Sequence, residues 1–261
     1  MLAPASFRVK NFVSGTKFYA RKGAYGLTAN IYCGLHEFGE MAFLLHFLRP
    51  DDLFFDVGAN AGSYTLLAAG ACRAKTIAFE PVNETFGYLT KNIRLNGLQN
   101  ITQLINAAAG EKQGTVTFTS DEDITNHAIP GGEDNHNHII VNVVPVDSFI
   151  ADAVPCLIKI DVEGFETEVL KGMENTLGSD SLKAIIIELN GSGARYGFDE
   201  SKIHELLLSK QFKPYNYDPF HRQLTEQASY GNHNTIYCRD IGFVSHRVHT
   251  AAPFSIMGEK I

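Results

Sequence analysis

The sequence predicts an α/β fold of the doubly wound, Rossmann-like class, in which helices cover both faces of a mostly parallel sheet. The main observation is that short apolar segments alternate with helical segments, a pattern typical of right-handed βαβ units. The chain is also large enough, because 261 residues of which 44% are hydrophobic can form one extensive core. Finally, a turn with two glycines, Gly58 and Gly62, directly follows the first predicted strand.

The predicted elements follow one another in a regular order. Five apolar segments read as parallel strands: residues 53–57, 76–79, 101–105, 157–160 and 184–188. Helices are predicted at residues 63–72, 83–95, 167–177 and 201–209. Further extended segments are predicted at residues 116–119, 139–146, 212–217 and 235–239. Ahead of them all, residues 37–48 read as an amphipathic helix that ends at Arg49-Pro50.

The charge of the chain is unevenly distributed. The net charge is −7, from 29 acidic residues against 22 Lys and Arg. The whole excess lies in residues 113–158, which contain no Lys or Arg and seven acids: Asp121, Glu122, Asp123, Glu133, Asp134, Asp147 and Asp152. Nucleic acid requires a basic surface, so we expect no nucleic-acid partner.

No segment reads as a targeting or membrane element. Residues 1–10 lack the apolar run of a signal peptide, and no later stretch approaches the ~18 uninterrupted apolar residues of a membrane span. The four cysteines lie far apart and form no Cys-x-x-Cys motif: Cys33, Cys72, Cys156 and Cys238. We therefore expect a soluble cytoplasmic protein with reduced thiols and no membrane partner.

Ligands of doubly wound folds bind beyond the carboxyl ends of the strands, where the strand order reverses. The loop from Gly58 to Gly62 occupies such a place, and its backbone N–H groups can approach a ligand there. A dinucleotide motif Gly-x-Gly-x-x-Gly starting at Gly58 would need glycine where Asn60 and Ser63 stand, so the NAD interpretation fails at two of three glycines. Asp56, at the end of the strand, favours a cationic ligand instead. A turn that needs glycine only for its geometry is the alternative.

Acidic residues follow two other strands. Glu80 lies 22 residues after Gly58, a spacing typical of the carboxylate that accepts hydrogen bonds from ribose hydroxyls. Asp161 and Glu163 follow the strand at residues 157–160 and should face the same cleft. Glu166, in contrast, is expected to stabilise the N-terminus of the next helix.

Six short motifs occur in a specific order between residues 50 and 190. They are Asp56-Val57-Gly58-Ala59-Asn60-Ala61-Gly62, Phe79-Glu80-Pro81, Val146-Asp147-Ser148, Lys159-Ile160-Asp161-Val162-Glu163-Gly164-Phe165-Glu166, Leu170-Lys171-Gly172 and Ile187-Glu188. As an ordered set they resemble the FkbM family of S-adenosylmethionine-dependent methyltransferases. The resemblance implies a class I methyltransferase fold with a seven-stranded sheet and an antiparallel last strand. It also implies S-adenosyl-L-methionine as cofactor and O-methylation of a hydroxyl on a small molecule, often a sugar, glycan or polyketide-type natural product.

The resemblance assigns roles to residues at the strand ends. The residues expected to bind the cofactor are Asp56, Gly58, Asn60, Gly62, Tyr64, Thr65, Glu80, Asn106, Ala107 and Asp161. The glycine loop would cradle the methionine moiety, with Asp56 near its ammonium group, and Glu80 would hold the ribose diol. Asn106 and Ala107 would border the adenine, and Asp161 would lie closest to the sulfonium and the acceptor.

Methyl transfer to a hydroxyl requires an aligned acceptor and a base that removes its proton. The candidate catalytic residues are Asp161 as first choice, Glu163 as second and Glu188 as a neighbour. Histidines in loops would titrate in a more suitable range, and the sequence does not rank them: His127, His136, His138, His221 and His233. In a competing interpretation the three carboxylates bind Mg²⁺, or residues 133–138 bind a transition metal. We expect no metal.

The remaining segments are expected to surround this core. Residues 1–50 are predicted to form an N-terminal helical cap, 51–245 the methyltransferase domain with 113–158 as an acidic β insertion, and 246–261 a tail. The loop 121–138 and an aromatic segment should overhang the cleft, or else cover a sheet edge or a subunit contact. That segment contains Tyr215, Tyr217, Phe220, His221, Tyr230 and His233. Because the excess negative charge lies in residues 113–158, which are expected on the acceptor side, a neutral or amino-bearing acceptor is favoured over an anionic one. The oligomeric state is not indicated.

Two other functions remain open from the sequence. An NAD-dependent oxidoreductase or epimerase would also use a Rossmann-like fold with Glu80 on a ribose, but it would need a third glycine and a Tyr-x-x-x-Lys pair, and neither is suitably placed. A domain that binds the nucleoside without catalysis is the second alternative.

Overall fold

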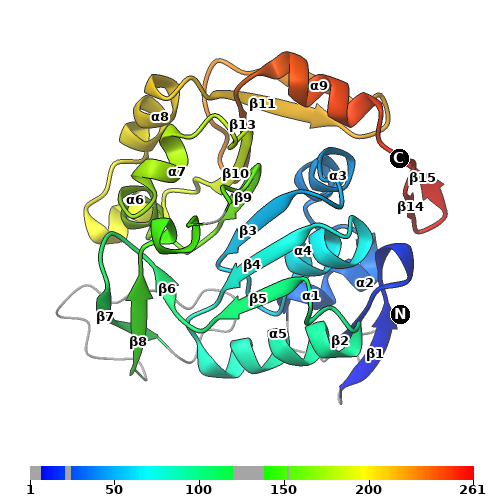
Figure 1. Ribbon diagram of the computed structural model, residues 1–261, viewed down its shortest axis with the longest axis horizontal. Helices are drawn as coiled ribbons and strands as arrows, with labels where there is room; N and C mark the ends of the chain where they lie inside the picture. Colours follow the sequence, from blue (N-terminus) through cyan, green and yellow to red (C-terminus); the bar gives the residue numbers. More distant parts are fainter. Residues whose placement is uncertain (1–6, 21–24, 120–137, 152) are drawn as a thin grey trace.

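The computed structural model describes residues 7–20, 25–119, 138–151 and 153–261, and it confirms the α/β class (Figure 1). Among these residues the central sheet has eight strands, in the order β12-β11-β13-β10-β9-β3-β4-β5. Their bounds are β12 (Gln223–Glu226), β11 (Lys213–Asp218), β13 (Asn234–Cys238), β10 (Ala184–Glu188), β9 (Leu157–Ile160), β3 (Leu53–Val57), β4 (Lys75–Phe79) and β5 (Thr102–Ile105).

The sheet is parallel at its centre and antiparallel at one side. Strands β10, β9, β3, β4 and β5 pair in parallel, whereas β13 is antiparallel to both β10 and β11. The chain runs outward from β3 to β5 and then returns to place β9 on the other side of β3. The strand order therefore reverses between β3 and β9, which is where a doubly wound fold binds its ligand.

The seven expected strands are all present, and the eighth corrects the expected count. Strand β12 lies between the extended segments predicted at residues 212–217 and 235–239, where no strand was predicted, and it pairs antiparallel with β11 from Tyr215↔Glu226 to Asp218↔Gln223. This strand is an edge strand whose residues are mostly exposed. Because it buries almost no apolar side chain, its sequence lacks the hydrophobic alternation on which the prediction of strands depends.

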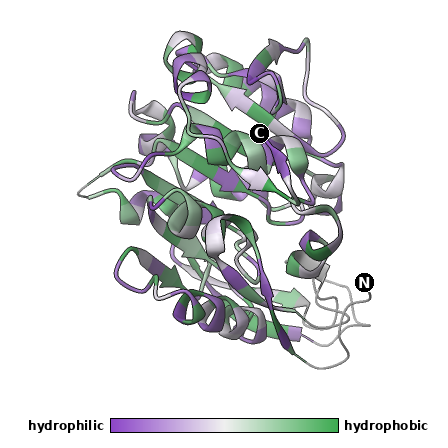
Figure 2. Ribbon diagram, turned by 90° about the vertical axis from the view of Figure 1, so that its right-hand side faces the viewer, coloured by the Kyte–Doolittle hydropathy of each residue, from purple (hydrophilic) through white to green (hydrophobic). Residues whose placement is uncertain are grey.

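Alternate side chains of the strands point to opposite faces of the sheet and form two cores. On one face, Phe54 of β3 packs with α3 (Phe38–Phe47) and α9 (Ile241–His249), and beside them lie α4 (Ser63–Thr65), the π-helical η2 (Leu66–Ala71) and α5 (Asn83–Leu95). On the other face, Phe55 packs with α6 (Glu166–Lys171), α7 (Glu174–Gly178) and α8 (Glu200–Ser209). Figure 2 shows mostly hydrophobic strands inside the molecule and many hydrophilic residues on the peripheral helices.

Two predicted helices differ from the observed ones. The helix expected at 63–72 becomes a π-helix after Thr65, and the helix expected at 167–177 is divided into α6 and α7. The division falls at Gly172, where a Cβ would stand 2.0 Å from the main-chain oxygen of Gly110. The tight contact with Gly110 therefore holds the chain where the helix is interrupted. Helices α3, α5 and α8 end within one residue of their predicted bounds.

The N-terminal segment contains more than the expected helical cap. It forms a hairpin of β1 (Arg8–Asn11) and β2 (Lys17–Ala20), joined by η1 (Val13–Gly15), and then α1 (Tyr25–Thr28), α2 (Asn30–Cys33) and α3. The hairpin lies along α5, where the backbone N–H of Lys17 donates to Asn96 at 2.7 Å and that of Tyr19 donates to Asn92 at 2.9 Å (Figure 1).

The predicted β insertion is partly described. Strands β6 (Ala108–Ala109), β7 (Gly114–Thr119) and β8 (His138–Val144) form a separate small sheet, followed by η4 (Val146–Phe149). The loop 121–138 that was expected to overhang the cleft lies, apart from His138, outside the described residues. His127, His136 and six of the seven acids of the insertion also lie outside them.

The C-terminal part completes the fold. The 3-10 helix η5 (Ser192–Tyr196) follows β10, and the hairpin of β14 (Ser255–Ile256) and β15 (Glu259–Lys260) follows α9. The expected domain boundary at residue 245 falls inside α9. In the part of the chain that the structure describes, no helix combines the length and the apolar character needed to cross a membrane.

Candidate active site

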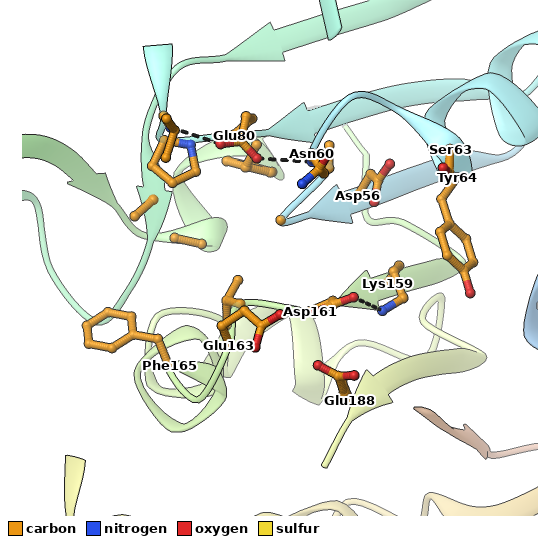
Figure 3. Close-up of a pocket in the computed structure, with 18 of the residues that line it drawn as sticks. Asp56, Asn60, Ser63, Tyr64, Glu80, Lys159, Asp161, Glu163, Phe165 and Glu188 are labelled. Atoms are coloured by element: carbon orange, nitrogen blue, oxygen red, sulfur yellow. Dashed lines mark hydrogen bonds and ion pairs between the residues drawn. The ribbon is translucent and has the colours of Figure 1, made fainter. Parts of the chain in front are cut away.

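A cavity of about 290 Å³ opens at the carboxyl ends of β3, β4, β9 and β10 (Figure 3). The turn after β3, the residues after β4, and the loop after β9 from Asp161 to Phe165 border it, together with Glu188 at the end of β10. His36 and Glu37, which precede α3, also line it. The cavity therefore lies where the strand order reverses, as the predicted fold requires.

The turn after β3 is built around Gly58. Its φ is +82°, and a Cβ at this residue would stand 1.8 Å from the main-chain oxygen of Asp161. Only glycine adopts this conformation while the loops after β3 and β9 touch. Gly62, with φ +98°, meets a similar restriction, since its Cβ would lie 2.7 Å from Leu89.

The backbone N–H groups of this turn are engaged within the protein. Those of Gly58 and Ala59 donate to the main-chain oxygen of Phe79, at 3.1 and 2.9 Å. The N–H of Asn60 donates to Glu80. The turn is therefore preorganised by its own hydrogen bonds, and the expectation that these N–H groups reach a ligand is not met by Gly58, Ala59 or Asn60.

Asp56 is buried beneath the turn. The hydroxyl of Thr65 donates to its Oδ2 at 2.5 Å, and burial raises the pKa of Asp56 to about 6 despite this bond. Asp56 borders the cavity, whereas Thr65 is fully buried and is not part of the lining. Thr65 therefore orients the Asp56 carboxylate from behind.

Glu80 is held in position by two backbone N–H groups. Its Oε2 accepts from Asn60 at 3.0 Å and its Oε1 from Val82 at 2.9 Å (Figure 3). Burial raises the pKa of Glu80 to about 7, although both hydrogen bonds act in the opposite direction. Each carboxylate oxygen retains a second lone pair, so the group can still accept hydrogen bonds from ribose hydroxyls.

The residues after β5 divide between two roles. Ala107 and Ala108 are buried and line the cavity, next to Val82 and Phe118, and these four make an apolar wall beside Glu80. Asn106 is not part of the lining. Its amide donates to the main-chain oxygens of Glu80 and Pro81, at 2.9 and 3.1 Å, and so holds the turn after β4 in place.

These observations show that the cavity suits the nucleoside cofactor that the resemblance implies. The apolar wall offers a surface for a purine ring, and Glu80 stands beside it where the sugar hydroxyls would follow. Asp56 supplies a buried carboxylate for a cationic group, and Gly58, which also lines the cavity, lets the loops after β3 and β9 touch at its edge.

Three carboxylates meet on the opposite wall (Figure 3). One oxygen from each of Asp161, Glu163 and Glu188 can be chosen so that all three lie within 4.8 Å of one another. Burial and the charge of Asp161 raise the pKa of Glu188, whose Oε2 is buried and makes no hydrogen bond within the described structure. Burial and the charges of Asp161 and Glu166 raise the pKa of Glu163 to about 7.

Asp161 differs from its two neighbours because Lys159 lies beside it. The ammonium of Lys159 donates to its Oδ2 at 3.0 Å. Burial acts to raise the pKa of Asp161, but the charge and the hydrogen bond of Lys159, together with its neighbours Glu188 and His36, hold that pKa below its usual value. In the same way burial acts to lower the pKa of Lys159, while the carboxylates of Asp161 and Glu37 keep it above its usual value. The pair is therefore ionised.

The loop after β9 is strained at Glu163. Its φ of +54° is uncommon for a residue other than glycine, and such conformations cluster at functional sites. Glu166 supports the loop, as its Oε1 accepts from the backbone N–H groups of Val162 and Gly164 at 3.1 and 3.2 Å. Glu166 therefore has a structural role, as expected, but its hydrogen bonds hold the loop before α6, whereas the expected role was at the N-terminus of that helix.

The N-terminal segment contributes side chains to the cavity that the sequence pattern does not indicate. The phenol of Tyr64 donates to Oε2 of Glu37, and the Nδ1 of His36 lies 3.3 Å from Asn30 Oδ1. Burial lowers the pKa of His36. Nothing in the local pattern of residues 30–37 indicates this role, because it depends on contacts with α4.

The prediction that the aromatic segment overhangs the cleft is wrong. Tyr215 and Tyr217 are core residues, and Tyr217 hydrogen-bonds to His46 at 2.6 Å. The exposed Phe220 packs on Phe38, and His221 pairs with Asp218. The cavity lining among the described residues includes none of the six residues of that segment, and it does not include His138. The alternation of β11 directs its tyrosines toward α3 instead of toward the cleft.

The chain matches a known family and two named relatives. Residues 56–218 match the model of the methyltransferase FkbM domain. Hexuronic acid methyltransferase AglP of Haloferax volcanii is 27% identical over 169 residues, which cover 63% of this chain and 64% of that protein. Methyltransferase 1 of Beauveria bassiana is 28% identical over 189 residues, covering 62% of this chain and 73% of that protein. The match to the first relative thus spans less than two thirds of its length.

Among solved structures, TrmK of M. capricolum, in complex with the natural cofactor product S-adenosyl-homocysteine, is similar with a TM-score of 0.44. Its sequence identity is 10%, and the match covers 77% of this chain and 68% of that one. The family match includes Asp56, Glu80 and the carboxylates at Asp161, Glu163 and Glu188. His36 and Glu37 lie outside it.

Proposed function

We propose that this chain, which belongs to the FkbM methyltransferase family, methylates a hydroxyl group of a sugar or a sugar-like small molecule. It is an S-adenosyl-L-methionine-dependent methyltransferase. The observation that carries the proposal is the meeting of Asp161, Glu163 and Glu188 on the wall that faces the Glu80 side of the cavity. A hydroxyl acceptor would thereby find both hydrogen-bond acceptors and a base beside the cofactor.

The cofactor's place follows from the side chains that line the cavity. Glu80 would accept hydrogen bonds from the ribose, Asp56 would lie near the ammonium group, and Val82, Ala108 and Phe118 would contact the base. When bound, S-adenosylmethionine supplies a methyl group that its sulfonium already activates. The protein's own contribution is then to exclude water, to align the acceptor and to take its proton.

We assign the removal of the proton to Glu163 in preference to Asp161. A general base is most effective when its pKa lies near the working pH, and the pKa of Glu163 is about 7. Asp161, held ionised by Lys159, is a weaker base and is better suited to orient the hydroxyl. The raised pKa of Glu188 favours its protonated form, which can donate a hydrogen bond to an acceptor oxygen.

Two observations favour different classes of sugar, one acidic and the other neutral or amino-bearing. One relative is named a hexuronic acid methyltransferase, which favours an acidic sugar. The carboxylates of the cavity favour a neutral or amino sugar, because a carboxylate acceptor would be repelled. A neutral or amino sugar is our choice, since Lys159, the cation within the described lining, is already paired with Asp161.

The experiment is a methyl-transfer assay with the intact protein and S-adenosylmethionine. Glucose, glucosamine and glucuronic acid, each as its methyl glycoside, would be compared by mass spectrometry for the gain of one methyl group. Transfer to the neutral or amino sugar is expected. Transfer to glucuronic acid alone would contradict the choice of sugar, and transfer to an amine or carboxylate oxygen would contradict the hydroxyl specificity.

Calorimetry distinguishes the alternative functions. The proposed function requires that S-adenosylhomocysteine binds and that Glu80→Ala abolishes this binding. Tight binding of NAD without binding of S-adenosylhomocysteine would support an oxidoreductase. Binding of S-adenosylhomocysteine without turnover of any hydroxyl acceptor would support a nucleoside-binding domain without catalysis.

A further inference from the structure

Lys159 is an unusual residue for the centre of a parallel sheet. It belongs to β9, between β3 and β10, and its side chain is only 2% exposed. A lysine is almost never buried to this extent unless its charge is paired, because desolvation of an ammonium group is costly. The neighbouring residues of β9 are buried and apolar, so the lysine contributes nothing that a core strand requires.

The ammonium of Lys159 connects three separate elements. Its Nζ lies 3.0 Å from Oδ2 of Asp161 after β9 and 2.9 Å from Oδ1 of Asn234 in β13. It also lies 5.3 Å from the ring centre of Tyr64 in α4. Asn234 pairs in register with Glu188, so the contact of Lys159 with β13 lies next to another carboxylate of the cluster, that of Glu188.

A positive charge stabilises the ionised forms of carboxylates that meet at one place. Asp161, Glu163 and Glu188 have oxygens within 4.8 Å of one another, so any two of them that are ionised repel each other in this partly buried site. A divalent cation is one solution that proteins use for such clusters. In this chain a cation of the protein itself is already hydrogen-bonded to the cluster at Asp161.

We propose that the Lys159 ammonium is the built-in cation of the acceptor site, which orients Asp161 and makes a divalent metal ion unnecessary for methyl transfer. Lys159 is thus a positioning residue that acts through Asp161. The inference rests on the proposed function, because the acceptor hydroxyl is taken to lie at this cluster.

The geometry opposes a metal ion at the same place. Mg²⁺ needs carboxylate oxygens at about 2.0–2.1 Å in an octahedral shell that also contains several waters. Asp161 Oδ2 already accepts from an ammonium at 3.0 Å, so a cation bound to Asp161 would stand close to another positive charge. Removal of the lysine charge should therefore turn the cluster into a metal site.

A titration with Mn²⁺ alone tests this without any acceptor. Binding would be followed by electron paramagnetic resonance for the wild-type protein, Lys159→Ala and Lys183→Ala. Lys183 is the matched control, because it forms a lysine–aspartate pair with Asp240 on the surface. We expect Lys159→Ala to bind Mn²⁺ at least about tenfold more tightly than the other two proteins. Saturable binding by the wild type that is lost in Glu188→Gln would overturn the proposal.

The activity gives a second readout. Wild-type turnover should be unchanged by EDTA, and Lys159→Ala should lose about 10²-fold in kcat, as expected for the loss of one preorganised charge. Ethylammonium should restore part of that loss in a saturable manner, whereas ethanol should not. Loss of wild-type activity in EDTA with recovery in Mg²⁺, or equal effects of ethylammonium and ethanol, would contradict the role of the charge.

The two readouts separate the possible failures. Binding of S-adenosylhomocysteine, measured by calorimetry, shows that each variant is folded. If Lys159→Ala does not fold, a double variant replaces it, Lys159→Met with Asp161→Asn, in which both charges of the pair are removed. This double variant should bind Mn²⁺ no better than the wild type. If the wild type methylates no sugar, the proposed function fails while the Mn²⁺ comparison still decides the role of Lys159.

Discussion

The backbone of Gly58 and the main-chain oxygen of Asp161 are in contact, so close that a Cβ on residue 58 would stand 1.8 Å from this oxygen. The same two loops are joined by the backbone N–H of Asp161, which donates to Val57 at 3.0 Å. The turn on the cofactor side and the loop that carries the acidic cluster are therefore one packed unit. A disturbance of either is expected to affect the other.

Gly58→Ala should damage this unit. The new methyl group has no space against the Asp161 oxygen, and φ +82° is unfavourable for alanine, so the loops must separate. We expect a loss of roughly 1–3 kcal/mol in the free energy of unfolding and a weaker affinity for S-adenosylhomocysteine, measured by urea unfolding and calorimetry.

The control for this change is Gly87→Ala in α5. Nothing lies within 4 Å of a Cβ at Gly87, so this variant should keep its affinity and gain up to about 1 kcal/mol of stability from helix propensity. Equal affinities of the Gly58→Ala variant and the wild type would show that the contact does not shape the cofactor site.

The buried carboxylates should make the protein without cofactor less stable as the pH rises. The pKa of Glu80 is raised to about 7 in the folded state from an ordinary value of 4.5, so between these values the folded state binds more protons than the unfolded state. The free energy of unfolding should therefore fall as the pH rises through this range, by up to about 1.4 kcal/mol per unit of pKa shift. Asp56 and Glu166 act in the same direction.

Urea unfolding of Glu80→Gln and the wild type at about pH 5 and about pH 8 isolates the contribution of Glu80. The advantage of the wild type over the variant should be larger at the lower pH. Glu84→Gln, the same change at an exposed site of α5, should follow the wild-type curve at both values. A difference between Glu80→Gln and the wild type that does not vary with pH would contradict the raised pKa.

The sequence was sufficient for the parts of the fold that depend on local patterns. Buried parallel strands read as apolar runs, and the acids directly after them, Glu80 and Asp161, were found because their position after a strand is itself the signal. Strand β12 was missed because an exposed edge strand has no apolar face. The helix division at Gly172 was missed because it depends on the close approach of Gly110.

The candidate site was predictable only where it follows the strand order. The roles of Glu37 and Lys159 depend on partners distant in the chain, since Tyr64 lies 27 residues from Glu37 and Asn234 lies 75 residues from Lys159. Lys159 reads in the sequence as one polar residue within a strand. No spacing rule connects it to β13, because that strand reaches its place only through the order of the complete sheet.

The contact between Tyr64 and Glu37 should anchor the N-terminal segment to the cavity. Tyr64→Phe removes the hydroxyl that donates to the Glu37 carboxylate, which is only 22% exposed and would be left without this partner. We expect a loss of about 1–3 kcal/mol in the free energy of unfolding. The affinity for S-adenosylhomocysteine should fall as well, because His36 and Glu37 line the cavity.

Tyr88→Phe is a closely matched comparison for that variant. The phenol of Tyr88 also donates to a glutamate, Glu84, at 3.2 Å, but on the exposed face of α5. This change should alter the free energy of unfolding by no more than about 0.5 kcal/mol. Similar losses in the two variants would indicate that the N-terminal contact has no special role.

Glu163 provides the most direct test of the chemistry. As a base it must be deprotonated, and its pKa is about 7, so kcat of the wild type should rise with pH through about 7 and then level off. Glu163→Gln should lower kcat by about 10²–10⁴-fold and remove this rise, while the affinity for S-adenosylhomocysteine stays unchanged. Glu168→Gln, which alters an ion pair with Lys171 outside the cavity lining, should behave as the wild type. If Asp161→Asn removes the rise and Glu163→Gln retains it, Asp161 is the base, as the sequence alone suggests.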